Sequence, residues 1–214
     1  MAIKPILFNT EMVRAILDGR KSCTRRLVRF LPGENPQWTG YIRDGLMLYN
    51  GRNEPCIIKA PYQPGDILYV RETWEHFECW NCEGDERGNC PNEPQKSVLD
   101  KTCGCYMYRA TNEIRGDARW HPSRHMPKEA ARIWLKVTDV RVERLQDITI
   151  DDIRGEGLSS VAVHAGDMEI ALEEWKRLWN STIKKPDIDR YGWDATPYVW
   201  VIKFERCKKP EGVK

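Results

Sequence analysis

Apolar and polar residues alternate along this chain with the periods of short strands and single amphipathic helices. An apolar run over residues 3–8 predicts an opening strand. Asn9 or Thr10 can cap the helix that follows, and its apolar positions recur every three or four residues as far as Leu17. Gly19 is placed to end this helix, because glycine readily takes the left-handed conformation that closes a helix.

The rest of the chain continues in the same way. Asp44-Gly45 is a strong turn signal between apolar flanks, and it predicts a hairpin over residues 41–49. Thr149 can cap a short helix, and tryptophans recur at helical spacing at positions 175 and 179 of a later one. The other predicted strands span residues 25–30, 67–70, 106–110, 131–145 and 198–204.

Strands therefore outnumber helices, and single helices stand between them. A parallel doubly wound sheet would need a helix after nearly every strand, which this chain lacks. The pattern favours an α+β fold, with a mixed β-sheet curled into a small barrel and flanked by helices. No internal repeat and no second domain is visible, so we expect a single domain over residues 1–214.

Composition limits the class of protein. A chain of 214 residues can bury a sizeable core. The mean hydropathy of −0.64 is polar, but 9 Trp, 8 Tyr and 4 Phe exclude a disordered chain. No apolar stretch reaches membrane-spanning length and the first residues do not form a signal peptide, so we expect a cytoplasmic protein with no membrane partner, in the host cytoplasm if it is encoded by a phage. In that reducing compartment, the eight cysteines favour metal or catalytic roles over disulfides.

Positive charge gathers near the start of the chain, although the formal net charge is only +2. Residues 14–29 contain six basic side chains and one acidic one, a local charge of +5. At their centre is the basic segment Gly19–Arg26. Such a cluster attracts phosphate by Coulomb attraction and counterion release, but a solvated protein face would look the same.

A cysteine-rich insertion over residues 75–105 interrupts the regular pattern. Cysteine pairs that are close in sequence bend around one tetrahedral ion, and a segment without its own core needs such a link to be ordered. We expect a structural zinc ion with no catalytic metal, held by four of five cysteines: Cys79, Cys82, Cys90, Cys103 and Cys105. His76 is an alternative ligand and an iron–sulfur cluster an alternative group. Cys23, Cys56 and Cys207 are expected to be ordinary thiols.

The segment Ile16–Arg26, with its Gly-Arg-Lys-x-x-Thr-x-Arg pattern, resembles the opening signature of ASCH domains. Pro64–Trp74 resembles the Gly-Asp turn and strand of the same family. Tyr108–Ala110, Trp120–Pro127 and Gly192–Phe204 are similar to a larger subgroup common in phages and prophages. The resemblance implies a PUA-like β-barrel and a partner that is RNA or a modified nucleoside or base.

One small member of this superfamily hydrolyses the amide of N4-acetylcytidine with a Lys, a Thr and a distant Glu. The resemblance implies that Lys21, Thr24 and Glu156 take these places here. A threonine hydroxyl is a weak nucleophile and needs a neighbouring base, which Lys21 could supply if the nearby arginines lowered its pKa. The alternative is that Lys21 and Thr24 contact phosphate and sugar while Glu156 only pairs with an arginine.

Three further functions stay open: a non-catalytic reader of RNA or a modified base, a ribonuclease using His121 or His125, and a phage interaction or assembly factor. The last would contact a protein partner through the cysteine-rich insertion. For ligand binding, aromatic side chains could stack on a base, although indoles more often fill a core. The candidate ligand-binding residues are Arg20, Arg25, Arg26, Glu72, Trp74, Tyr108, Trp120, His125 and Trp193.

Overall fold

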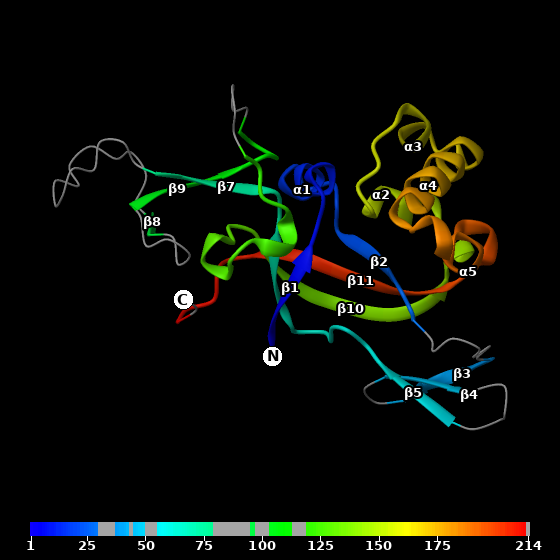
Figure 1. Ribbon diagram of the computed structural model, residues 1–214. Coiled ribbons are helices and arrows are strands. Elements are labelled where there is room, and N and C mark those ends of the chain that lie inside the picture. The colour runs from blue at the N-terminus through cyan, green and yellow to red at the C-terminus, as the bar shows by residue number, and fades with distance from the viewer. Residues whose placement is uncertain are drawn as a thin grey trace. The chain divides into compact units, whose positions relative to one another are not determined.

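The computed structural model describes residues 1–29, 37–42, 45–49, 55–78, 95–96, 103–112 and 119–212 (Figure 1). The chain divides into two compact units. Unit 1 contains Met1–Ala2, Asp18–Ile67 and Lys136–Glu205, and unit 2 contains Ile3–Leu17, Leu68–Leu135 and Arg206–Lys214. The molecule combines sheets and helices, so the predicted α+β class is confirmed. Closure of the sheet into a PUA-like barrel stays a prediction.

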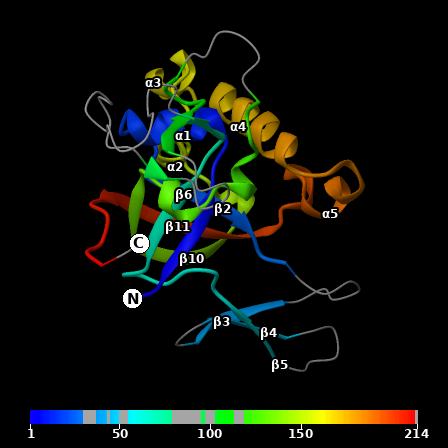
Figure 2. The same cartoon turned by 60° about the vertical axis from the view of Figure 1, so that its left-hand side comes forward.

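Three sheets are present among the described strands. The largest has five strands in the order β1-β6-β10-β11-β2, and the other two have the orders β3-β4-β5 and β7-β9-β8. β2 (Cys23–Leu27) pairs antiparallel with β11 (Tyr198–Cys207) (Figure 2). In this pair Thr24 lies opposite Ile202 and Arg26 opposite Trp200. The strand predicted over residues 25–30 therefore begins two residues earlier and ends at Leu27. β10 (Trp134–Arg144) matches its prediction closely.

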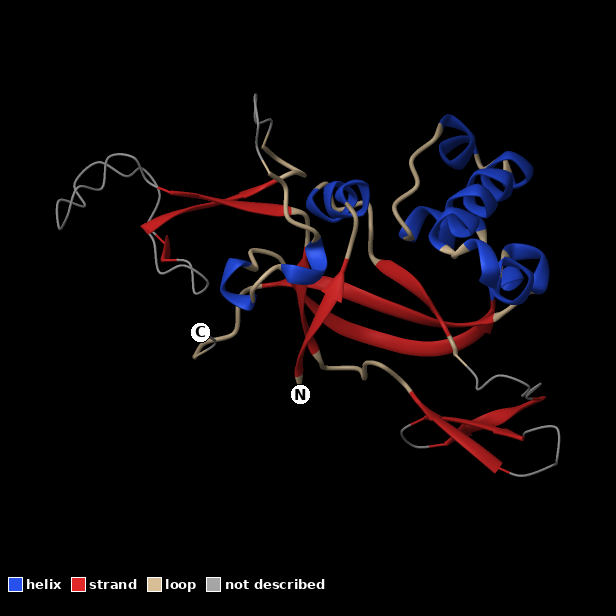
Figure 3. Cartoon of the chain, in the orientation of Figure 1, coloured by secondary structure: helices blue, strands red, loops and turns tan. Residues whose placement is uncertain are grey.

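The helices of unit 1 follow β10 in the chain and gather into one cluster (Figures 1 and 3). Thr149 caps α2 (Ile150–Gly155) as predicted, since its hydroxyl accepts from the Asp152 N–H while the Asp152 side chain accepts from the Thr149 N–H. The other helices of this cluster are α3 (Val161–Ala165), α4 (Met168–Thr182) and α5 (Ile188–Tyr191). Short 3₁₀ turns lie at Leu145–Asp147, Lys185–Asp187 and Trp193–Ala195.

The core of unit 1 forms where α4 packs on β11. Trp175 and Trp179 are buried, as their helical spacing predicts, and their rings lie 6.2 Å apart. They join Val199 and Val201 of β11 and Ile153 of α2 in one apolar cluster. Burying large aromatic side chains in this way contributes strongly to stability, so α2, β2, β11 and α4 are held against a common core.

A separate small sheet in unit 1 contains β3 (Gln37–Ile42), β4 (Gly45–Tyr49) and β5 (Pro55–Lys59). β3 and β4 pair antiparallel, with Ile42 opposite Gly45, which confirms the hairpin predicted from the Asp44-Gly45 signal. Asp44 itself lies outside the described residues. β4 pairs antiparallel with β5 in turn.

Unit 2 opens with β1 (Ile3–Leu7) and α1 (Thr10–Leu17), where the sequence predicts them. The Asn9 side chain accepts from the Met12 N–H, so Asn9 supplies the side-chain cap. β6 (Ile67–Arg71) is buried along most of its length. Short 3₁₀ turns at Ser123–His125 and Lys128–Ala130 follow later in the unit.

Strands lie at both ends of the cysteine-rich segment: the first is not predicted by the sequence pattern, and the second begins three residues before the strand predicted over residues 106–110. β7 (Trp74–Glu78) pairs antiparallel with β9 (Cys103–Tyr108), and β8 (Gln95–Lys96) pairs with β9 on its other edge. β7 lacks an apolar alternation because Glu75 and His76 stand inside it. Paired strands therefore flank the segment, and the insertion over residues 75–105 itself stays a prediction.

Candidate functional site

Lys21 and Glu156 meet inside unit 1. Their backbones form an isolated antiparallel bridge, and the Ser22 N–H donates to the Gly155 carbonyl at 2.8 Å. On its other side, the Ser22 carbonyl accepts from the Phe204 N–H of β11 at 2.9 Å. The segment that carries Lys21 is therefore held between the end of α2 and the last strand.

The two side chains form a buried ion pair. Lys21 Nζ lies 2.7 Å from Glu156 Oε2 and 2.8 Å from the Glu156 carbonyl oxygen. The side chains are 0% and 2% exposed, respectively. Removing two charges from water costs several kcal/mol per ion, which such a pair regains only with close geometry and additional hydrogen bonds. The second bond to the Glu156 carbonyl supplies one of these.

Arg25 completes the surroundings of the Glu156 carboxylate. It lies 3.4 Å from Glu156 Oε1, so lysine and arginine bind different oxygens of the same carboxylate. The Arg25 side chain is 0% exposed, and its other terminal nitrogen lies 3.2 Å from Glu143 and 3.3 Å from Asp152. Arg141 pairs with the same two acidic residues. The result is a network, buried at Lys21, Arg25 and Glu156 and half-buried at its edge, in which acids of β10 and the α2 region surround the basic strand.

Asp152 in this network and Cys23 beside it have pKa values shifted from their ordinary ones. Burial alone would raise the pKa of the Asp152 carboxyl, but hydrogen bonds from Thr149 and the positive charges of Arg25 and Arg141 lower it below its ordinary value. Burial, reinforced by the charge of Glu156, raises the pKa of the Cys23 thiol to about 12. Cys23 is thus a buried neutral thiol, as expected for an ordinary cysteine.

Thr24 and Arg26 lie on the opposite face of β2 from Arg25, because successive strand residues alternate. The Thr24 residue is 2% exposed. Burial lowers the pKa of Arg26, while Tyr62 and Glu156 act in the opposite direction. Tyr62 is therefore within electrostatic reach of Arg26, and burial raises its own pKa. A single tyrosine before a Pro-Gly turn gives no signal in the sequence, so Tyr62 was not predicted.

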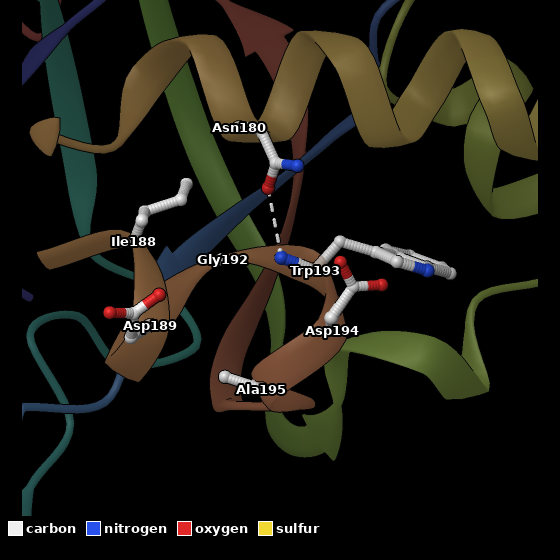
Figure 4. A pocket seen from close by; sticks show the side chains of 7 residues that line it. All are labelled: Asn180, Ile188, Asp189, Gly192, Trp193, Asp194 and Ala195. Carbon is white, nitrogen blue, oxygen red and sulfur yellow. Dashed lines mark hydrogen bonds between the residues drawn. The ribbon is translucent and has the colours of Figure 1, made fainter.

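The other two predicted ligand-binding residues of unit 1 lie apart from this network. Arg20 donates to Asp18 and, at 2.6 Å, to the carbonyl of Gly157, one residue beyond Glu156. Trp193 is half-buried and lines a cavity of about 260 Å³ near the end of α4 (Figure 4). The backbone N–H of Trp193 donates to Asn180 Oδ1 at 2.9 Å. The other lining residues are Ile188, Asp189, Gly192, Asp194 and Ala195.

Within unit 2, Glu72 and Tyr108 belong to one polar cluster. Arg132 binds both oxygens of the buried Glu72 carboxylate, at 2.9 and 3.0 Å. The same guanidinium lies over the Tyr108 ring, 4.0 Å from its centre, and the Tyr108 hydroxyl donates to the Ala130 carbonyl at 2.7 Å. Glu72 and Tyr108 are thus engaged by residues of their own unit.

The remaining predicted ligand-binding residues of unit 2 differ in exposure. Trp74 is 2% exposed and packs between His121, stacked at 5.0 Å, and Tyr106 at 5.7 Å. Trp120 is half-buried. His125 is exposed and its Nε2 accepts from the neighbouring arginine. Trp74 therefore fills core, whereas His125 is open to solvent.

The predicted metal ligands lie almost wholly outside the described residues. Cys79, Cys82 and Cys90 are not described, and of Cys103 only the backbone is. Cys105 is half-buried on β9, opposite Phe77. The zinc ion stays a prediction.

No protein-family model matches this chain, and no curated protein is significantly similar to it. Among solved structures, the chain is similar to the crystal structure of an ASCH domain from Lactobacillus crispatus JV V101. The identity is 11% and the TM-score 0.38, over 96% of this chain and 79% of that one. This is the family that the segments Ile16–Arg26 and Pro64–Trp74 resemble.

In the described ranges, no helix has the length and apolar character of a membrane span.

Proposed function

We propose that this protein binds a modified pyrimidine nucleoside or nucleotide and hydrolyses the amide of an N-acylated pyrimidine such as N4-acetylcytidine. The observation that carries the proposal is the buried ion pair between Lys21 and Glu156. These residues are 135 positions apart, and they are the two that the resemblance to the amide-hydrolysing member pairs with Thr24. A generic basic surface would not require a buried carboxylate at this point.

The ion pair favours a particular division of roles. As an ammonium ion, Lys21 is suited to stabilise the oxyanion that forms when the acyl carbonyl is attacked. As a carboxylate, Glu156 is suited to accept the proton of the attacking hydroxyl and then deliver it to the leaving amine. This assigns the base to Glu156 instead of Lys21.

The reaction then balances in two steps. In the proposed first step, ligand binding brings the Thr24 hydroxyl within reach of Glu156, the Thr24 oxygen bonds to the acyl carbon, its proton passes to Glu156, and collapse of the intermediate releases the pyrimidine amine with that proton. Water next attacks the acyl-threonine, which releases the carboxylic acid and restores the Thr24 hydroxyl. Burial supports this chemistry because charges act more strongly away from water.

The test is to incubate the protein with N4-acetylcytidine and to follow cytidine and acetate by chromatography. We expect Thr24→Val to abolish turnover and Thr24→Ser to retain part of it, because only serine keeps a hydroxyl. Thr138→Val is the matched control, since Thr138 is exposed on β10. No cytidine from the unaltered protein, or full turnover by Thr24→Val, would reject the amidohydrolase.

One observation favours a second candidate, a non-catalytic reader of RNA or a modified base. Both carboxylate oxygens of Glu156 are already occupied, one by Lys21 and one by Arg25. A reader predicts binding of cytidine and N4-acetylcytidine with no change in either compound after long incubation. Isothermal titration calorimetry together with chromatography of the same samples separates the two functions.

A further inference from the structure

A second cavity in unit 1 opens beside the basic strand. It has a volume of about 280 Å³ and lies where the end of β2 meets the last turn of α4. Three arginines contribute to its wall, and the lining residues in the described part of the chain are Arg25, Arg26, Leu27, Arg29, Trp179, Thr182 and Ile183. The volume is at the small end of the range for ligand pockets, enough for a phosphate with part of its sugar.

The first indication of a ligand is an unused donor. Arg25 Nε is buried and has no hydrogen-bond partner among the described residues, although the terminal nitrogens of the same guanidinium are paired. Buried donors normally have partners, because an unmet one costs free energy. An acceptor atom of a ligand bound in the cavity would give Arg25 Nε the hydrogen bond that it lacks.

The second indication is an uncompensated charge. Arg29 is exposed, and within the described part of the chain no ion pair is formed by it. The neighbouring cations differ in this respect: Lys21 is paired with Glu156, and Arg25 with three carboxylates. Arg29 therefore brings to the cavity a positive charge that no described carboxylate neutralises.

Part of the negative charge at the helix end beside the cavity is met by hydrogen bonds within the helix terminus. A helix C-terminus carries partial negative charge on its free carbonyls. In α4, however, the carbonyls of Leu178, Trp179 and Asn180 each accept a bond, from the Ser181 hydroxyl, the Thr182 hydroxyl and the Ile183 N–H. Trp179 and Ile183 add apolar surface on this side beside the exposed Thr182, and this surface suits the carbon skeleton of a ligand.

We infer that this cavity binds the phosphate group of the ligand, so that the protein prefers a nucleotide or RNA to the free nucleoside. The inference rests on the proposed function and deepens it. Arg25 connects the two places, because it lines the cavity and also contacts Glu156. A phosphate held by the arginines would fix the attached nucleotide relative to Lys21.

The experiment measures binding of cytidine 5′-monophosphate, cytidine and inorganic phosphate by calorimetry. Neither cytidine nor its monophosphate carries an acyl group, so the binding result does not depend on turnover. We expect the monophosphate to bind at least about tenfold more tightly than cytidine, and Arg29→Gln to remove that difference. Each lost phosphate contact should also reduce the slope of log K against log salt by about 1.

Arg177→Gln is the matched control, because Arg177 is exposed on α4 and lies two positions before Trp179, on a different side of the helix. Equal affinity for cytidine and its monophosphate, absence of monophosphate binding, or equal losses in the two variants would overturn the phosphate site. A preference for the monophosphate without hydrolysis of any acylated compound would reject only the amidohydrolase. Tighter binding of a cytidine-containing trinucleotide than of the monophosphate would identify RNA as the source of the phosphate.

Discussion

Lys21 Nζ and Glu156 Oε2 lie 2.7 Å apart, with both side chains almost fully buried. The contact joins the basic segment Gly19–Arg26 to the end of α2. Lys21 therefore does not add to the positive charge of the protein surface, because its charge is buried and paired with the Glu156 carboxylate.

Removal of one partner from this pair should destabilise the protein by about 3–5 kcal/mol, because the other charge is left buried and uncompensated. We expect this for Lys21→Met and for Glu156→Gln. The double variant should lose clearly less than the sum of the two, since it leaves neither charge alone. Urea unfolding followed by tryptophan fluorescence measures all three, and strictly additive losses would show that the two side chains do not interact.

Arg25→Lys should destabilise the protein by about 1.5–3 kcal/mol, because an ammonium group cannot reach Glu143, Asp152 and Glu156 together and at least one charged hydrogen bond is lost. Arg177→Lys, on the exposed face of α4, should change stability by less than about 0.5 kcal/mol. Equal midpoints for the two variants in urea would mean that Arg25 is not a fixed member of the network.

Asp152 should make stability depend on pH in the acid range. Its pKa is lower in the folded protein than its ordinary value of 3.8, so its contribution is fully present above that value and is lost as the pH falls through the folded pKa. Asp152→Asn should cost about 1 kcal/mol at pH 7, as loss of a helix cap does. The difference from the unaltered protein should shrink below pH 3.8. Urea midpoints at several pH values check this, with exposed Asp151→Asn as the control.

Cys23 should resist alkylation in the folded protein. The Cys23 residue is 3% exposed and burial raises the pKa of its thiol to about 12, so very little thiolate is present at pH 8. Half-buried Cys207 should react faster. Peptide mass spectrometry after iodoacetamide treatment, with and without urea, measures both rates. Labelling of native Cys23 as fast as Cys207 would contradict the buried position.

The cysteine-rich segment should retain one zinc ion per chain when the protein is purified without chelator. Elemental analysis by mass spectrometry measures the zinc and the iron content of the same sample, and so distinguishes a zinc ion from an iron–sulfur cluster. Cys82→Ser should lower the metal content, whereas Cys56→Ser, outside the segment, should leave it unchanged. Less than one metal ion per chain in the unaltered protein would exclude the metal site.

Local elements were predictable where their signals are local. The asparagine cap and the 3.6-residue period identify α1, the Thr149–Asp152 capping box begins α2, and the spacing of Trp175 and Trp179 identifies the buried face of α4. β7 was missed because polar residues occupy a strand whose stability comes from pairing with β9, about 30 residues later. Pairing partners are not encoded in the local period.

The sequence by itself determined the α+β class, the main strands and helices, and the concentration of positive charge between Arg14 and Arg29. Only the tertiary structure decided which of these basic side chains are buried and which carboxylates they pair with. Glu143, Asp152 and Glu156 come from β10 and α2, more than 100 positions from the basic strand, and they enclose Lys21 and Arg25. A count of charges along the chain cannot contain these contacts, because burial and Coulomb energy depend on distance in space.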